Sequence, residues 1–233
     1  MILRNWDDLP DFMRVNEVRP YWEVLKRHEG QLVLKRVFDV FAGIVLLVIL
    51  AIPMTVIAIQ IKKDSPGPVF YRQERVTTYG KKFRIHKFRT MVDGADKQGS
   101  AVTVDHDSRI TKVGAKLRDK RLDELPQLFD VLDGNMSFVG TRPEAVEYVK
   151  QYGKYNKAYY ATLLLPAGIT SEASIRFKDE AEMLDKAKDV DIVYMRDVLP
   201  EKMKRNLRSI RKFNCFSEIE TMIRTVFAVS GKE

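Results

Sequence analysis

The sequence predicts an α+β fold: a small, mostly helical globular domain with a β-hairpin, attached to a membrane-embedded helix near the N-terminus. Three observations predict it. An apolar run covers residues 37–61, two short strand-like segments flank a Tyr-Gly pair at 79–80, and amphipathic helical patterns follow. We expect an interfacial segment at 1–34, the membrane helix at 35–63 and a cytoplasmic domain at 64–233.

The apolar run reads VFDVFAGIVLLVILAIPMTVIAIQI, with a single acid and an interior proline, Pro53. A straight helix of this length would extend about 37 Å, enough to cross a hydrocarbon core of about 30 Å. Proline removes a backbone donor, so we expect a break or kink there. Basic pairs at 35–36 and 62–63 flank the run, so neither end is the obvious one to translocate. A kinked single span and a hairpin that returns to the same face are equally compatible with these residues.

The composition limits the class of partner. The chain has 40 Lys and Arg against 32 Asp and Glu, a formal net charge of +8, which suits nucleic acid, anionic lipid or phosphorylated small molecules. The membrane segment and the lack of RNA-binding or zinc motifs argue against nucleic acid. The single cysteine, Cys215, fits a reducing cytoplasm. The apolar run starts too late and is too long for a cleavable signal peptide, so we expect none.

The rest of the chain alternates turn signals with short elements. Turn-forming residues at 64–68 precede two strands, at 69–71 and 83–86, which we expect to pair as a hairpin around Gly80. Residues 93–109 are expected to be a loop. Pro20 is suited to start a helix that faces either the membrane interface or the domain itself. Further helices are expected at 111–119, from Asp123 to a stop at Gly134, and at 144–162, 179–187 and 200–212.

The last helix has the clearest pattern. Ser217 and Glu220 form a capping box, and an apolar stripe runs from Ile219 to Phe227 at helical spacing. Such a stripe more often faces a protein core than a membrane surface, so we expect a core-facing helix.

Two adjacent carboxylates, Asp123 and Glu124, come just before Pro126. Because proline is favoured in the first turn of a helix, the pair is predicted to lie at a helix N-terminus, which favours anions. An ionised Asp there is suited to attack phosphorus and form an acyl phosphate. Taken alone, the same pattern is more typical of a structural helix cap.

Basic residues that could hold a phosphate occur around this pair in the sequence. Lys87 and Arg89 alternate along a predicted strand and should share a face. Arg118 precedes the acid pair, and Arg142 stands in a Gly-Thr-Arg-Pro loop. Ammonium and guanidinium groups are the usual clamps for a phosphate or pyrophosphate. The alternative is a solvated basic face against anionic lipid head groups.

Other candidates are weaker. The triplet Asp105-His106-Asp107 has metal-ligand residue types, but a solvated loop is the more common explanation. His86 is expected to fill space between strand residues. Gly67 and Gly80 are isolated, so no Gly-rich phosphate loop is present.

Several motifs in one order resemble a known family. After the basic pair and the apolar segment with its proline come Asp-Ser-x-Gly-Pro-Val-Phe-x-Arg-Gln at 64–73 and Lys-Phe-Arg-Thr-Met at 87–91. Leu-Asp-Glu-Leu-Pro-Gln-Leu follows at 122–128 and Met-Ser-Phe-Val-Gly-x-Arg-Pro-Glu at 136–144. This series resembles the bacterial sugar transferases, the monotopic polyprenyl-phosphate phosphoglycosyl transferases. The resemblance covers roughly residues 35–175.

The resemblance implies transfer of a phosphosugar from a UDP-sugar to polyprenyl phosphate, expected to be undecaprenyl phosphate, with release of UMP. It implies a covalent phosphosugar–aspartate intermediate, Mg²⁺ as cofactor, and a first membrane step in making a capsule, exopolysaccharide or O-antigen. It also implies a re-entrant helix broken at Pro53, on the cytoplasmic face of the bacterial inner membrane. The resemblance therefore favours the hairpin over the single span.

The family's functional residues map onto matching positions. Asp123 corresponds to the nucleophile and metal ligand, with Glu124 as its partner in metal binding or proton handling. Lys87 and Arg142 occupy basic positions that would hold the substrate phosphates, and Arg118 is expected to join them. Ile52 stands where many members have a serine before the membrane proline, and Thr55 is the nearest hydroxyl that could replace it.

Two other classes remain as alternatives. One is a non-catalytic membrane-anchored protein that holds anionic lipid with its basic face. The other is a glycosyl transferase that moves a sugar without its phosphate and releases UDP.

Overall fold

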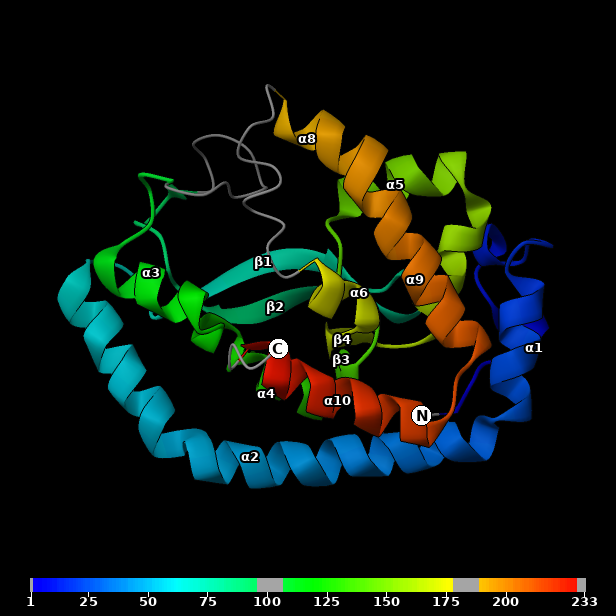
Figure 1. The fold of residues 1–233 in the computed structure, drawn as a ribbon, viewed down its shortest axis with the longest axis horizontal. Coiled ribbons are helices and arrows are strands. Elements are labelled where there is room, and N and C mark those ends of the chain that lie inside the picture. Colours follow the sequence, from blue (N-terminus) through cyan, green and yellow to red (C-terminus); the bar gives the residue numbers. More distant parts are fainter. Residues whose placement is uncertain (1, 96–106, 178–188, 230–233) are drawn as a thin grey trace.

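The computed structural model describes residues 2–95, 107–177 and 189–229. It confirms an α+β fold, in which helices surround two small sheets (Figure 1). The described elements are η1 (Trp6–Asp8), η2 (Asp11–Met13), α1 (Arg19–Arg27), α2 (Glu29–Asp64), β1 (Phe70–Val76), η3 (Thr78–Gly80), β2 (Lys82–Phe88), α3 (Lys112–Asp119), η5 (Leu122–Glu124), α4 (Gln127–Leu132), β3 (Met136–Val139), α5 (Val146–Tyr155), η6 (Lys157–Leu164), β4 (Ala167–Thr170), α6 (Glu172–Arg176), α8 (Val190–Val193), the π-helical turn η7 (Tyr194–Val198), α9 (Leu199–Arg211) and α10 (Cys215–Val229).

The apolar run lies within α2, a helix of 36 residues that begins six positions before the expected boundary, at Glu29 instead of Lys35. It contains Pro53 without being interrupted. Figure 1 shows that its second half turns away from the direction of its first half, so the helix bends rather than breaks. The Thr55 hydroxyl donates to the carbonyl of Ala51, 2.8 Å away, as expected of a hydroxyl near a proline bend.

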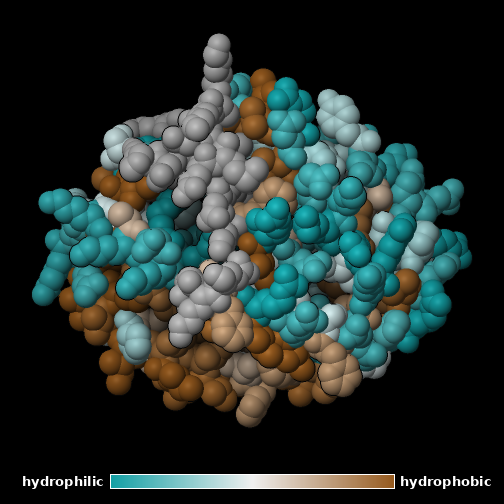
Figure 2. Space-filling view, in the orientation of Figure 1, coloured by the Kyte–Doolittle hydropathy of each residue, from teal (hydrophilic) through white to brown (hydrophobic). Residues whose placement is uncertain are grey.

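The apolar residues of α2 are mostly exposed. Its most apolar window is only 17% buried in the protein, and large side chains such as Val48, Ile49 and Ile52 are at least 62% exposed. By length and composition this helix could cross a membrane. Figure 2 shows hydrophobic residues gathered along the lower edge of the molecule, where α2 runs in Figure 1.

The chain before α2 contributes to the main core. Leu9, Met13, Val18 and Leu25 are at most 3% exposed and pack in one cluster with residues of α5, η6 and α9. Trp22 is partly buried, and its indole Nε1 donates to the carbonyl of Arg4 at 2.9 Å. This core lies at one end of the molecule and joins the two halves of the chain.

The predicted hairpin is confirmed. β1 and β2 pair antiparallel with Phe70 opposite Phe88 and Tyr71 opposite Lys87. The connection between the strands, residues 77–81, contains η3 and includes Tyr79 and Gly80, both with positive φ. A second sheet, which the sequence did not predict, pairs β3 and β4 in parallel.

The expected helices are confirmed in part. The one at 200–212 matches α9, but the one expected at 144–162 divides into α5 and the 3₁₀ helix η6. The helix expected at 179–187 lies outside the described residues.

The expectation of a core-facing last helix is wrong. In α10, Phe216, Ile223 and Val226 are 85%, 53% and 68% exposed. The helix lies beside α2 at the lower edge of the molecule, so its apolar stripe adds to the apolar side of α2 (Figures 1 and 2). Its cap is also different from the expected box: the Asn214 side chain accepts from Ser217 N at 2.8 Å.

Candidate active site

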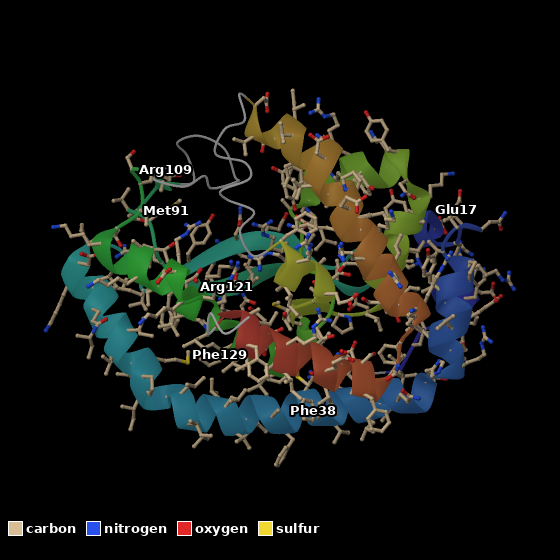
Figure 3. The ribbon with its side chains drawn as sticks, viewed as in Figure 1. Glu17, Phe38, Met91, Arg109, Arg121 and Phe129 are labelled. Atoms are coloured by element: carbon tan, nitrogen blue, oxygen red, sulfur yellow. The ribbon has the colours of Figure 1, made fainter. Side chains whose placement is uncertain are left out.

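Asp123 and Glu124, the carboxylate dyad, lie in the single 3₁₀ turn η5. Arg121, which marks the place of this turn in Figure 3, precedes it with a left-handed backbone, φ 53°. The helix that the sequence placed at the dyad starts later, at Gln127 in α4, with Pro126 as its N-cap. The dyad therefore occupies the turn leading into the helix, and its two side chains have different surroundings.

Glu124 is held between two cations. Its Oε1 accepts from Lys87 Nζ at 2.9 Å and from Arg142 Nη2 at 2.8 Å, and the residue is only 9% exposed. Burial alone would raise the pKa of Glu124, but the charges of Arg142 and Lys87 and their hydrogen bonds outweigh it and hold that pKa well below its usual range. Three of the residues predicted from the sequence thus meet at one carboxylate oxygen.

Asp123 has the opposite environment. Within the part of the chain that the structure describes, no hydrogen bond or ion pair engages its carboxylate. Burial raises its pKa, and the negative charge of Glu124 acts in the same direction, while Lys87, Arg118 and Arg142 act against them. The dyad therefore consists of one carboxylate that is already paired and one whose oxygens are available to a ligand.

Arg118 approaches the same site from α3. Its Nη1 lies 3.4 Å from the Thr90 hydroxyl, and its charge stabilises the ionised forms of Asp123 and Glu124. Burial lowers the pKa of both Arg118 and Lys87. Cations that are partly removed from water bind an anionic ligand more strongly than solvated ones.

Arg89 does not join this cluster. β2 ends at Phe88, so the alternation that should place Arg89 beside Lys87 stops there. The Arg89 guanidinium instead donates to the carbonyls of Pro66 and Ser65, at 2.5 and 2.7 Å, and the residue is 5% exposed. These contacts fix the loop after α2, and this placement does not support the phosphate-binding role predicted for Arg89.

A family model for bacterial sugar transferases matches residues 30–232. The chain belongs to the bacterial sugar transferase family. It is 33% identical over 195 residues to the UDP-glucose:undecaprenyl-phosphate glucose-1-phosphate transferase of Escherichia coli K12, covering 83% of this chain and 39% of that protein. A putative undecaprenyl-phosphate N-acetylgalactosaminyl 1-phosphate transferase of Bacillus subtilis is 43% identical over 122 residues, 52% of this chain and 68% of that protein.

A third relative, the UDP-N-acetylgalactosamine-undecaprenyl-phosphate N-acetylgalactosaminephosphotransferase of Aeromonas hydrophila, is 37% identical over 142 residues, which is 61% of this chain. This chain spans only 34% of that relative's length, and 36% of a Klebsiella pneumoniae relative. Every residue of the candidate site lies inside the range that the bacterial sugar transferase model matches.

The described residues of this family member offer one carboxylate, but no cluster of carboxylates, for binding a magnesium ion. Within the described ranges no group of three or more His, Cys, Asp or Glu side chains gathers. Mg²⁺ commonly binds through one or two carboxylates together with substrate phosphates and water, and Asp123 offers such a carboxylate. Of the weaker candidate triplet, residues 105 and 106 lie outside the described part of the chain, and Asp107 pairs with Arg109 at 2.6 Å.

His86 is not a mere space filler, contrary to the prediction. Its Nδ1 lies 2.8 Å from one oxygen of Asp130, and its backbone N–H donates to the other at 2.8 Å. Asp130 is 1% exposed on α4, and burial raises its pKa. This pair fixes α4, and with it the turn that carries the dyad, against β2.

Sequence reasoning missed a second polar group that interacts electrostatically with Arg142. Arg75 on β1 donates to Gln73 Oε1 at 2.5 Å, and burial lowers its pKa, with Glu144 acting against this. The Glu144 carboxylate accepts from the Tyr194 hydroxyl at 2.8 Å. The signal was available: alternation along β1 places Arg75 and Tyr71 on one face, and Tyr71 pairs with Lys87.

Proposed function

We propose that this chain is a phosphoglycosyl transferase. It transfers a phosphosugar from a UDP-sugar to undecaprenyl phosphate or a similar polyprenyl phosphate, and it catalyses the first membrane step of capsule, exopolysaccharide or O-antigen synthesis. The named activities of the relatives support the reaction class. The observation that carries the proposal is the asymmetry of the dyad: Glu124 is paired with Lys87 and Arg142, while the Asp123 carboxylate has no hydrogen bond or ion pair among the described residues.

In the first half-reaction, an Asp123 oxygen attacks the sugar-bearing phosphorus of the UDP-sugar. The bond from that phosphorus to the bridging oxygen breaks, and UMP leaves with the electron pair. Lys87, Arg118 and Arg142 provide positive charge where the transferring phosphoryl group would develop negative charge. Glu124 keeps Lys87 and Arg142 in place through its two hydrogen bonds.

In the second half-reaction, a phosphate oxygen of the polyprenyl phosphate attacks the phosphorus of the phosphosugar–Asp123 intermediate. The phosphorus–Asp123 bond breaks and the carboxylate is regenerated, giving a polyprenyl diphosphate sugar. The covalent intermediate allows a soluble donor and a lipid acceptor to use one site in turn. Asp123 would also hold Mg²⁺, which when bound would neutralise phosphate charge.

We propose further that α2 enters and leaves the membrane on the cytoplasmic face of the bacterial inner membrane. Its bend, its exposed apolar side and the basic pairs at 35–36 and 62–63 support a re-entrant position. Lys62 and Lys63 at its end are exposed and suited to anionic lipid head groups.

The topology is tested by labelling intact cells with an impermeant thiol reagent. In a chain with Cys215→Ser, cysteines introduced at Gly30, where an added side chain meets open space, and at the exposed Lys63 report the two ends of α2. Protection of both in intact cells and labelling of both after lysis is expected. Labelling of one end alone in intact cells would establish a true span.

The reaction is tested by nucleotide release. Detergent-solubilised protein with undecaprenyl phosphate, Mg²⁺ and a panel of UDP-sugars should release UMP with at least one sugar, and Asp123→Asn should abolish that release. Asp119→Asn, an exposed neighbour at the end of α3, is the matched control and should behave as wild type. Release of UDP would identify transfer of the sugar without its phosphate. Full activity of Asp123→Asn would disprove the assignment of Asp123 as the nucleophile.

A further inference from the structure

One turn of α2 carries charge that points into the protein. Lys35 and Asp39 lie one turn apart on this otherwise apolar helix, and their exposures are 9% for the Lys35 side chain and 3% for Asp39. Charged groups on a membrane helix are costly unless they find partners, so their partners indicate what they do. The backbone groups that Lys35, Arg36 and Asp39 contact lie in α4 and β3, which follow or precede the segments that carry the candidate site. Lys35 has one further partner, in α10.

Arg36 holds the end of α4. Its Nη1 donates to the carbonyl of Val131 at 2.6 Å, and its Nη2 donates to that of Leu132 at 2.9 Å. Carbonyls in the last turn of a helix lack partners within the helix, and a guanidinium satisfies two at once. Because α4 follows the dyad turn directly, Arg36 fixes the element into which Asp123 and Glu124 lead.

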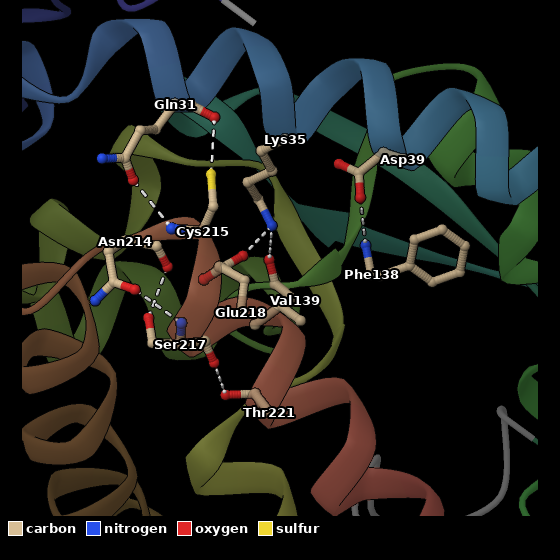
Figure 4. A network of polar contacts seen from close by, with 10 residues as sticks. All are labelled: Gln31, Lys35, Asp39, Phe138, Val139, Asn214, Cys215, Ser217, Glu218 and Thr221. Carbon is tan, nitrogen blue, oxygen red and sulfur yellow. Dashed lines mark hydrogen bonds and ion pairs between the residues drawn. The ribbon is translucent and has the colours of Figure 1, made fainter.

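Lys35 and Asp39 hold the edge of β3. The Asp39 carboxylate accepts from the backbone N–H of Phe138 at 3.3 Å, and Lys35 Nζ donates to the carbonyl of Val139 at 2.8 Å (Figure 4). β3 also pairs in parallel with β4, so this short strand is contacted by both β4 and α2. Three residues after Val139, the chain reaches Arg142, which contacts Glu124.

The C-terminal helix completes this contact. Glu218 of α10 forms an ion pair with Lys35, and the two side chains are 18% and 9% exposed. Next to it, the Gln31 side chain accepts from Cys215 N at 3.0 Å (Figure 4). Lys35 therefore joins α2, β3 and α10 at one buried point.

We propose that Lys35, Arg36 and Asp39 are positioning residues of the active site. This rests on the proposed function. They hold the two segments that carry Glu124 and Arg142 at one register on the membrane helix, and they fix the distance between those segments. The dyad is thereby held at a constant depth relative to the bilayer that contains the polyprenyl phosphate. The residues act through Arg142 and the dyad and do not touch substrate.

The main test compares Lys35→Met with Lys154→Met. Both remove one lysine from a helix, but Lys154 is exposed near the end of α5 and has no role in the proposed site. A displaced clamp of about 1 Å costs about 100-fold in rate, so we expect Lys35→Met to lose about 10- to 100-fold in kcat/KM for UMP release. Lys154→Met should stay near wild type. Equal activity of the two variants would overturn the proposal.

A double-mutant cycle separates positioning from general stability. If Lys35 acts through Arg142, the loss caused by Lys35→Met should shrink in an Arg142→Gln background. The same fold-loss in both backgrounds would mean that Lys35 acts only on stability and would overturn the proposal. If Lys35→Met fails to fold, Asp39→Ala and Asp39→Asn replace it: Asn retains an oxygen that accepts from Phe138 N and should restore the activity that Ala loses.

A measurement without substrate keeps the proposal independent of the reaction. Amide hydrogen exchange in Lys35→Met should rise in the segment from Phe138 to Arg142 and stay unchanged in β1 and β2, relative to Lys154→Met. Wild-type protein that releases no UMP with any sugar would disprove the proposed function. Unchanged exchange in that segment would disprove the positioning role on its own.

Discussion

The candidate site and the apolar face formed by α2 and α10 differ in the kind of side chain they present. At the site, Lys87, Arg142 and Glu124 are largely withdrawn from water and compensate one another. On the apolar face, large side chains such as Ile52 and Phe216, 78% and 85% exposed, have no protein cover. The first region suits a charged, soluble donor, and the second suits lipid. Three charged side chains of α2, Lys35, Arg36 and Asp39, connect the two regions by contacting backbone groups of β3 and α4.

The largest effect should come from removing the metal. Chelation with EDTA should reduce UMP release to background, and added Mg²⁺ should restore it, because Asp123 would share the ion with the substrate phosphates. The melting temperature without substrate should change little, since the described residues offer few protein ligands. Full activity in EDTA would remove Mg²⁺ from the proposal and leave phosphate binding to the cations alone.

The next effect concerns the cations. Lys87→Met removes a positive charge that would stabilise the transferring phosphoryl group. Loss of one such stabilising side chain costs about 100- to 1,000-fold in kcat. Lys82→Met on the same strand removes an equal charge that is exposed and paired with Glu74 at 2.9 Å, so it should be nearly neutral. Comparable activity of the two variants would mean that the cluster acts only through net charge, as in a lipid-binding protein.

The hairpin and most residues of the candidate site could be predicted from the sequence. The alternation around Tyr79-Gly80 predicted the hairpin correctly, because paired strands and a tight turn are local features. The family motifs pointed to Lys87, Glu124 and Arg142, which the structure brings together.

What the sequence could not predict depends on contacts between distant segments. The parallel pairing of β3 and β4 depends on two four-residue strands whose register is set by their packing. Arg89 was misplaced because nothing local shows that β2 ends at Phe88. The stripe of α10 was recognised, but an amphipathic pattern does not say whether protein or lipid covers it.

The pH dependence should separate the two carboxylates of the dyad. The charge of Glu124 contributes to the raised pKa of Asp123, and a nucleophilic Asp123 must be ionised. Removing that charge in Glu124→Gln should lower the pKa of Asp123 and move the acid limb of the kcat/KM profile to lower pH. Glu74→Gln, at the exposed end of a surface ion pair, should leave the limb in place. An acid limb that moves to higher pH in Glu124→Gln would contradict this assignment.

The smallest effect should come from the apolar face of α10. Phe216→Ser with Val226→Ser removes two of its most exposed apolar side chains. Each buried side chain of this size contributes about 1.5–3 kcal/mol to transfer out of water, but the much larger apolar side of α2 stays intact. We expect the double variant to remain in the membrane fraction and to be released a few-fold more readily by an alkaline wash. Glu220→Gln serves as the control on the same helix. Wild-type retention of the double variant would place the α10 stripe against protein, and the apolar face would then belong to α2 alone.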